Sequence, residues 1–346
     1  MKNNAIYIYG IIPNFYSAEI FRSLDNSGVY AIPWQNVSAI VSDREGLMLD
    51  YYDREALGQL LVQHQKTIEE LMLKGFNMLI PLQLGTIVAS KTEVVKILTN
   101  GYDLIIETLK KIEFLTEFDI AVTWADFPGI IKETANHHDI IELKTEIQNK
   151  TAAPTQIDQM KLGMMVQAIL KEKNTKVELN ILDALASISI DIKTHELMND
   201  EMITNSAVLI DRNKMAIFEK RIEKIDEEYK GMLNFKLVGP LPCYSFFTLE
   251  VKQLNPVNVA QAMAELGLNE ESSESEIKKA YLQKARIFHP DAQPDSMDEI
   301  MFNKINKAYH TLLDYSAVVR QTSKMNGISL TTESIKENLI LVKIKD

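Results

Sequence analysis

The feature that most constrains the fold is a pair of amphipathic helical patterns separated by the tripeptide His289-Pro290-Asp291. Ser273 and Ser296 each begin a capping box, a Ser-x-x-Glu pattern that satisfies free amides at a helix start. Pro290 ends the first helix, because proline lacks an amide proton. One face of each helix is apolar, formed by Ile277, Ala280, Tyr281, Ala285 and Phe288 before the turn and by Phe302, Ile305, Tyr309 and Leu312 after it. The two patterns predict an antiparallel helical hairpin with the tripeptide exposed at its tip.

This segment resembles a J domain. The resemblance is carried by Ile277-Lys278-Lys279-Ala280-Tyr281, by His289-Pro290-Asp291 and by residues 302–309, Phe-Asn-Lys-Ile-Asn-Lys-Ala-Tyr. In that family the turn and the basic face of the preceding helix bind an Hsp70 chaperone of the DnaK type and stimulate its ATPase. The resemblance therefore implies a set of Hsp70-binding residues: His289, Pro290, Asp291, Lys278, Lys279 and Arg286.

The charge of the helix before the turn suits such a partner. Glu274 and Glu276 are outnumbered by four cationic residues, Lys278, Lys279, Lys284 and Arg286, in a chain whose formal net charge is −11. A local cationic strip favours an acidic partner surface. The chain departs from the family at Leu282 and Gln283, where a basic pair is usual, and at Lys284, where a core leucine is usual. Two alternatives stay open, a J fold that no longer stimulates Hsp70 and a structural hairpin with a chance turn.

The chain before this segment reads as α+β. Residues 1–115 are expected to form a mixed N-terminal domain, because residues 5–12 and 37–42 alternate with period two, as strands do. A helix is predicted over residues 57–72 and a buried strand over residues 77–82. A capping box at Ser90 precedes an apolar stripe that predicts one continuous helix over residues 94–112.

Residues 116–252 are expected to form a second, ferredoxin-like domain. Its predicted elements are a strand over 118–124, a helix over 157–185, strands over 188–197 and 204–211, a helix over 218–232, and closing strands over 235–238 and 244–251. The order β, α, β, β, α, β is that of a ferredoxin-like unit. The J domain is then expected over residues 256–322, followed by a tail over residues 323–346. Within the tail, residues 339–344 fit either a strand or a disordered segment.

Four segments of residues 1–252, in order, resemble the gas vesicle protein family GvpL/GvpF. They are residues 6–11, 60–71, 78–87 and 239–246. The last, Gly-Pro-Leu-Pro-Cys-Tyr-Ser-Phe, is similar to the family's Gly-Pro-Trp-Pro-Pro-Tyr-Ser-Phe, with Leu241 and Cys243 as departures. The resemblance implies a two-domain α+β accessory protein without known catalysis, which helps the hydrophobic shell protein of gas vesicles to assemble.

Composition limits the partners and the compartment. A net charge of −11 disfavours a nucleic-acid partner, because phosphate binding needs clustered Lys and Arg. Cys243 is the only cysteine, so neither an intrachain disulfide nor a cysteine zinc cage can form. No run approaches the roughly 18–20 apolar residues of a membrane helix, and the N-terminus lacks the pattern of a signal peptide. We therefore expect a cytoplasmic protein associated with gas vesicles, with no membrane insertion, metal or cofactor.

No catalytic constellation is expected. His64 falls on an apolar helical stripe, which favours a satisfied core or interface histidine over a base or ligand. His137 and His138 are adjacent, so on a helix they diverge, which favours a solvated pair. Three methionines could line a soft client surface, although core packing is the favoured interpretation: Met160, Met164 and Met165.

Together these patterns predict a non-enzymatic gas vesicle assembly factor. It would act as a chaperone or adaptor for the hydrophobic shell protein, alongside other gas vesicle accessory proteins, and its J domain would recruit and stimulate Hsp70. The pairing is physically reasonable, because an unassembled shell subunit exposes apolar patches that aggregate. The alternative is a minor structural component of the vesicle, whose J-like domain is only an interaction surface.

Overall fold

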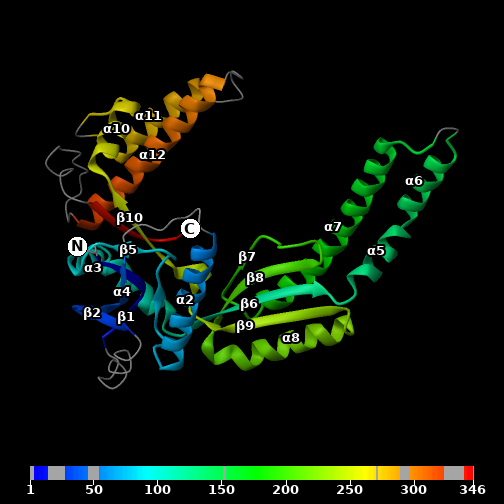
Figure 1. Cartoon of the computed structure of the whole chain (residues 1–346), viewed down its shortest axis with the longest axis horizontal. Helices are drawn as coiled ribbons and strands as arrows, with labels where there is room; N and C mark the ends of the chain where they lie inside the picture. Colours follow the sequence, from blue (N-terminus) through cyan, green and yellow to red (C-terminus); the bar gives the residue numbers. More distant parts are fainter. Residues whose placement is uncertain are drawn as a thin grey trace. The chain divides into compact units, whose positions relative to one another are not determined.

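The computed structural model describes residues 4–14, 28–45, 54–150, 153–269, 272–288, 296–322 and 339–345 (Figure 1). By its internal contacts the chain divides into two compact units, Met1–Lys111 with Phe247–Asp346, and Ile112–Phe246. The first unit is therefore built from both ends of the sequence. The finer division into domains over residues 1–115, 116–252, 256–322 and 323–346 stays a prediction.

An antiparallel sheet forms the N-terminal part of the first unit. Its order is β2-β3-β1-β4, and β5 also pairs with β1. The strands are β1 (Asn4–Pro13), β2 (Val29–Trp34), β3 (Val37–Glu45), β4 (Ile80–Pro81) and β5 (Ile87–Val88). Helix α2 (Arg54–Leu73) packs on β1, and α3 (Lys91–Asn100) packs on β2, β3 and β5. Strand β1 is almost wholly buried, which is why its residues are apolar at nearly every position.

The prediction of one helix over residues 94–112 is wrong. Two helices occupy this stretch, α3 and α4 (Tyr102–Ile112), and they meet at Gly101. The N–H of Gly101 donates to the carbonyl of Ile97 at 3.0 Å and closes the last turn of α3. A Cβ atom at Gly101 would lie 2.7 Å from a side-chain carbon of Val342, so glycine is required by the close approach of the Val342 side chain.

The second unit has the predicted ferredoxin-like topology. Its antiparallel sheet has the order β7-β8-β6-β9. The strands are β6 (Leu115–Trp124), β7 (Asp191–Thr194), β8 (Met202–Asp211) and β9 (Leu233–Leu241). Helices α7 (Gln156–Ala186) and α8 (Met215–Tyr229) pack on the sheet, and the short 3-10 helix η1 (Arg212–Lys214) precedes α8. Phe118, Ile181 and Phe218 lie at the centre of the shared core.

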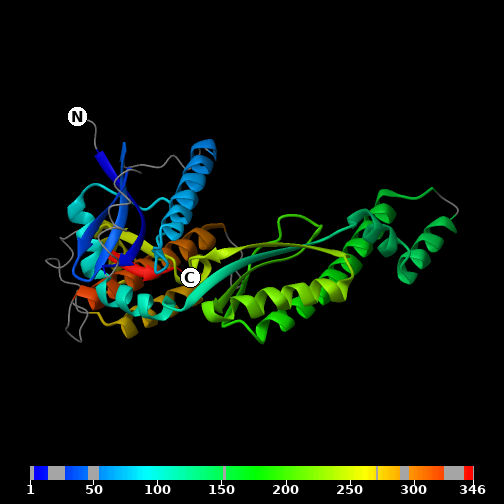
Figure 2. The ribbon, with the colours of Figure 1, turned by 90° about the horizontal axis from the view of Figure 1, so that it is seen from below.

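The first connection of this unit contains three helices. Helices α5 (Phe127–Ala135) and α6 (His138–Gln148) precede α7, and in Figures 1 and 2 they project with the start of α7 beyond the end of the sheet. We call these segments the arm. Met160 and Met164 of the arm are 62% and 63% exposed, so the prediction that they pack in a core is wrong.

The predicted closing strand over residues 244–251 is also wrong. Tyr244–Phe247 forms the short helix α9, and the strand that follows, β10 (Leu249–Leu254), belongs to the first unit. There it pairs antiparallel with β11 (Leu339–Ile344), from Leu249 opposite Ile344 to Leu254 opposite Leu339. The question left open for residues 339–344 is thereby answered in favour of a strand.

The C-terminal helices form the predicted hairpin. They are α10 (Pro256–Leu266), α11 (Glu274–Ile287) and α12 (Ser296–Thr322). Glu274 contacts Arg320 and Tyr281 contacts Asn306, so positions on α11 and α12 pair in opposite directions. No helix within the described ranges is long and apolar enough to cross a membrane.

Candidate functional site

The start of α11 follows directly from its sequence. Ser273 accepts a hydrogen bond from the N–H of Glu276, and the carboxylate of Glu276 accepts one from the N–H of Ser273 at 2.7 Å. The predicted capping box is therefore present. These bonds to Ser273 lower the pKa of Glu276, which keeps the carboxylate ionised at the positive end of the helix.

Aromatic stacking holds α11 against α12. The rings of Tyr281 and Tyr309 stack with their centroids 4.2 Å apart, and the hydroxyl of Tyr281 donates to Asn306 at 2.7 Å. Ile277 and Leu312 are fully buried beneath them. The apolar stripes read from the sequence are thus the two faces that meet.

Lys284 has a role different from that of the core leucine it replaces. Its ammonium group donates to the carbonyl of Glu265 in the last turn of α10. Helix α10 ends at Gly267, in the left-handed conformation with φ of 71°. A cation at this end satisfies a free carbonyl and interacts favourably with the helix dipole. The charge of Lys284 is therefore used within the fold.

The remaining predicted cations are available to a partner. Lys278, Lys279 and Arg286 are all exposed on α11, and Lys279 and Arg286 are seven positions apart, so they share one face. Within the part of the chain that the structure describes, none of the three takes part in an ion pair. His289, Pro290 and Asp291 lie outside the described residues, so their position beside this strip stays a prediction.

The β10–β11 ribbon joins these helices to the N-terminal sheet domain. Leu339 and Leu341 enter the buried cluster of the C-terminal helices. The carbonyl of Ile340, between them, accepts a hydrogen bond from Asn100 at the end of α3 at 3.0 Å. The amide of Gln321 on α12 donates to the carbonyl of Val342 at 2.6 Å. This junction was not predicted from the sequence, although four consecutive apolar residues, as in residues 339–342, are typical of a strand buried on both faces.

A polar cluster around the buried carboxylate of Glu117, in the second unit, was not predicted from the sequence either. Glu117 accepts from the N–H of Ser245 at 2.9 Å and from its hydroxyl at 2.8 Å. His195 Nε2 lies 3.4 Å from the same hydroxyl, and Lys193 donates to the carbonyl of Ser245 at 2.8 Å. Burial raises the pKa of Glu117 to about 7. In a hydrolytic triad the histidine stands between acid and serine. Here the acid contacts the serine directly, so the cluster anchors the chain at Ser245.

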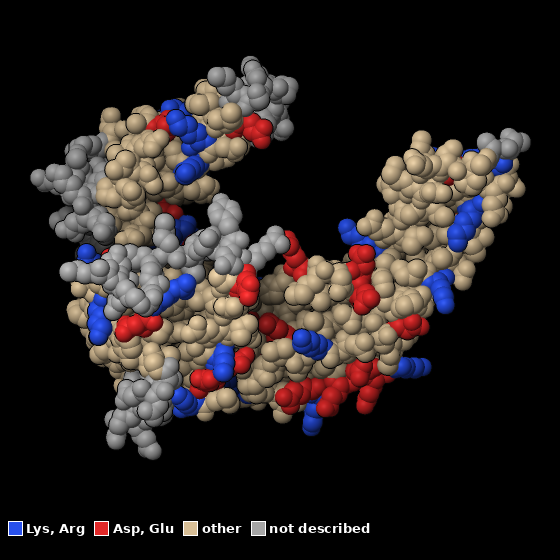
Figure 3. Space-filling view, in the orientation of Figure 1, with Lys and Arg blue, Asp and Glu red and all other residues tan. Residues whose placement is uncertain are grey.

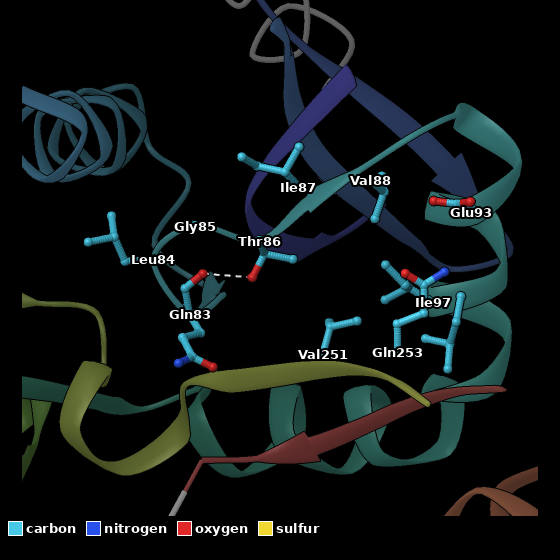
Figure 4. A pocket seen from close by; sticks show the side chains of 11 residues that line it. Gln83, Leu84, Gly85, Thr86, Ile87, Val88, Glu93, Ile97, Val251 and Gln253 are labelled. Carbon is cyan, nitrogen blue, oxygen red and sulfur yellow. Dashed lines mark hydrogen bonds between the residues drawn. The ribbon is translucent and has the colours of Figure 1, made fainter. Parts of the chain in front are cut away.

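In a small cavity of the first unit, the side chains of Thr86 and Glu93 are engaged in local hydrogen bonds. The cavity encloses about 180 Å³ beside β5, α3 and β10 (Figure 4). The hydroxyl of Thr86 donates to the carbonyl of Gln83 at 2.7 Å, the bond drawn as a dashed line. The carboxylate of Glu93 accepts from the N–H of Ala89 at 2.9 Å. These side chains stabilise the local backbone, and we assign no ligand to the cavity.

His64, His137 and His138 behave as predicted. His64 is 5% exposed, and its Nδ1 lies 2.8 Å from the hydroxyl of Tyr7, so it is a satisfied core histidine. Burial lowers its pKa to about 4. His137 and His138 are exposed, as expected for a solvated pair. His138 lies near Asp139 and Glu142, but this exposed group stands at the positive end of α6, which disfavours a cation.

Comparisons with known proteins agree with both resemblances. The family described as gas vesicle synthesis protein GvpL/GvpF matches residues 5–248, and the DnaJ domain matches residues 264–317. Gas vesicle protein F of Nostoc sp. is 22% identical over 248 residues, covering 70% of this chain and 98% of the relative. Chaperone protein DnaJ 1 of Aquifex aeolicus is 49% identical over 49 residues, covering 14% of each chain.

The fold of this chain is also similar to that of solved gas vesicle proteins. The crystal structure of the gas vesicle protein GvpF from Anabaena sp. PCC7120 superposes with a TM-score of 0.58 at 22% identity, covering 70% of this chain and 97% of that one. The structure of GvpF from Microcystis aeruginosa gives a TM-score of 0.56 at 19% identity. The chain therefore belongs to the GvpL/GvpF family of gas vesicle synthesis proteins and carries a C-terminal DnaJ domain.

Proposed function

We propose that this protein is a gas vesicle assembly factor. In this proposal the GvpF-like body acts as a chaperone or adaptor for the hydrophobic shell protein, and the J domain recruits an Hsp70 and stimulates its ATPase. The protein would act in the cytoplasm at the growing vesicle, with other gas vesicle accessory proteins, and would itself catalyse no reaction.

The junction formed by the β10–β11 ribbon carries the proposal. The ribbon contributes Leu341 to the core of the C-terminal helices and is bonded to Asn100 of the N-terminal domain. The J domain is thus packed against part of the body and is not a module on a free linker. An Hsp70 bound at the hairpin would therefore stay close to a client bound by that domain.

The electrostatics of α11 support the Hsp70 contact. Lys278, Lys279 and Arg286 are exposed cations on a chain of net charge −11, and an acidic partner surface would be attracted to them. Leu282 and Gln283 replace a usual basic pair, so the strip is thin. Its contact with Hsp70 would rest on exposed charges and should weaken as salt is raised. Asp291 would pair with a partner arginine.

The single-turnover ATPase of the host Hsp70, measured with the full chain, tests this role. The wild-type chain should accelerate hydrolysis, while His289→Gln and the pair Lys279→Gln with Arg286→Gln should abolish the acceleration. Lys307→Gln on α12 is the matched control, because it removes an exposed cation from another helix. If the wild-type chain has no effect on hydrolysis, the minor structural component with a J-like contact surface becomes the better account.

A further inference from the structure

A long groove in the second unit has no part in the proposed Hsp70 contact. It encloses about 760 Å³ beside α5, α7 and the turn before β8. Helix α7 lines it with residues three and four positions apart: Gly163, Val166, Gln167, Leu170, Lys171, Asn174, Thr175 and Glu178. This spacing follows one face of α7 for about 22 Å, at roughly 1.5 Å per residue. The groove is therefore as long as a helix of four turns.

Half of the sixteen residues that line the groove are apolar; Leu197 and Met198 among them are exposed, and Leu170 and Ile203 are buried. Apolar lining comes from α5, α7 and the turn before β8: Phe127, Ile131, Val166, Leu170, Leu197, Met198, Met202 and Ile203. Met198 is 79% exposed, and Met160 and Met164 are exposed on the same arm. Figure 3 shows few charged side chains on the visible face of the arm. Exposed apolar surface of this kind marks interaction sites, and methionine adapts its shape to a partner.

Gly163 gives this groove a geometric signature. Glycine in a helix interior is destabilising compared with alanine. A Cβ atom at Gly163 would meet nothing within 4 Å, so no packing among the described residues requires glycine there. A partner helix lying in the groove would require it, because the absent side chain lets two helix backbones approach closely.

The charges in the groove specify the partner further. Lys171 is the cation of the lining, and Glu178 and Asp200 are its anions. Among the residues that the structure describes, no ion pair uses any of these three groups. The excess of negative charge favours a partner that brings Lys or Arg.

We propose that the groove binds a cationic amphipathic α-helix of a partner protein. Its aliphatic side chains would contact Phe127, Leu170 and Met198, and its cations would face Glu178 and Asp200. The proposal gives the adaptor an additional partner-binding surface, in the second unit, and in that respect rests on the proposed function. Helix binding can nevertheless be measured without any chaperone, so the two proposals can fail separately.

The test is fluorescence anisotropy of the full chain with a labelled peptide of about 18 residues, long enough for the groove. The peptide is made of leucine, alanine and lysine with its leucines on one helical face, and a scrambled peptide of the same composition is the reference. We expect the amphipathic peptide to bind at least tenfold tighter than the scrambled one. Glu178→Gln with Asp200→Asn should weaken binding severalfold and reduce its dependence on salt.

Two glycines supply matched variants. Gly163→Gln places a side chain in the groove and should weaken binding at least tenfold. Gly58→Gln places the same side chain on α2, away from the groove, where a Cβ atom also meets nothing within 4 Å. This variant should leave peptide binding unchanged. Both variants should fold, since glutamine is a better helix former than glycine.

Three outcomes would overturn the proposal. The first is equal binding of the two peptides, and the second is an equal effect of Gly163→Gln and Gly58→Gln. The third is a dimer of the full chain, seen by light scattering, that Gly163→Gln dissociates, because the groove would then hold a second copy of this chain. Loss of Hsp70 stimulation with peptide binding intact would instead remove the proposed J-domain activity alone.

Discussion

Among single residues, the buried His64 should make the stability of the first unit depend on pH. Its imidazole is buried and its pKa is lowered to about 4, whereas an unfolded histidine titrates near 6.5. Between these values the unfolded chain binds a proton and the folded chain does not. The free energy of unfolding should therefore fall by up to about 3 kcal/mol as pH decreases from about 6.5 to 4. Urea unfolding at both ends of this range should show a smaller fall in His64→Gln, and equal falls would contradict the assignment.

Glu117 should make the stability of the second unit change with pH in the opposite direction, falling as pH rises. Its pKa is raised to about 7 by burial, above the value of 4.5 for a free glutamate. Its stabilising contribution is complete below about pH 4.5 and is lost, up to about 3 kcal/mol, as pH rises to about 7. Glu117→Gln should therefore be more stable than the wild type at pH 8, and the two should converge at pH 4.5. Circular dichroism melts of both proteins measure this, and a variant less stable at pH 8 would show that the carboxylate is needed there.

Replacement by alanine should change the free energy of unfolding in opposite directions at Gly163 on α7 and at Gly101 between α3 and α4. Gly163→Ala should raise the free energy of unfolding by about 0.5–1 kcal/mol, because a Cβ atom there meets nothing and the unfolded chain loses freedom. Gly101→Ala should lower it, because its Cβ atom would lie 2.7 Å from Val342. Chemical denaturation of both variants is the measurement. If Gly163→Ala were destabilising and Gly101→Ala stabilising, the open space at Gly163 or the close approach of Val342 to Gly101 would not be as described.

At the scale of elements, β11 should be essential to the J domain. Leu341 is 1% exposed in the core of the C-terminal helices. Leu341→Ala should cost about 2–5 kcal/mol through lost burial and a cavity. Hydrogen exchange should then show loss of protection in α12 and β11, with the four-stranded sheet of the second unit unchanged. Uniform loss over the whole chain would argue against this local coupling.

Periodicity predicted the type of most elements but not their partners. Local sequence patterns determine the apolar faces of α11 and α12 and the order of helices and strands in the ferredoxin-like unit. Both could therefore be predicted. The break at Gly101 was missed because apolar residues continue in step on both sides of it. The fate of residues 244–251 was missed because strand β10 is fixed by a partner strand 85 to 95 positions away, from Leu254 opposite Leu339 to Leu249 opposite Ile344. Met160 and Met164 were misjudged because spacing alone cannot tell a core stripe from an exposed one.

The candidate site was predictable to a similar extent. The cations of α11 and its capping box follow from local sequence, and the structure leaves Lys278, Lys279 and Arg286 exposed. The contact of Lys284 with Glu265 could not be read, because it joins two helices whose packing the sequence does not specify. The cluster around Glu117 likewise depends on a return of the chain after more than one hundred residues.

At the scale of the whole molecule, the second unit should fold by itself. Its first and last strands are neighbours: Glu117 lies opposite Leu241, and the hydroxyl of Thr116 donates to the carbonyl of Leu241 at 3.0 Å. The chain therefore enters and leaves this unit at one place, as inserted domains do. A fragment of residues 112–246 should show cooperative thermal unfolding and dispersed amide resonances. A fragment without a cooperative transition would mean that the first unit is needed for its stability.

The pairing of β10 with β11 has a consequence for protein synthesis. A ribosome releases residues 112–246 as one continuous stretch, so this unit can fold while translation continues. The C-terminal helices of the first unit must wait, because β11 follows every other described element and completes the core around α12. A nascent chain stalled before Leu339 should thus retain a protease-sensitive hairpin. Under the proposed function, contact with Hsp70 would begin only after translation has passed β11, because the core of the J domain is incomplete until then.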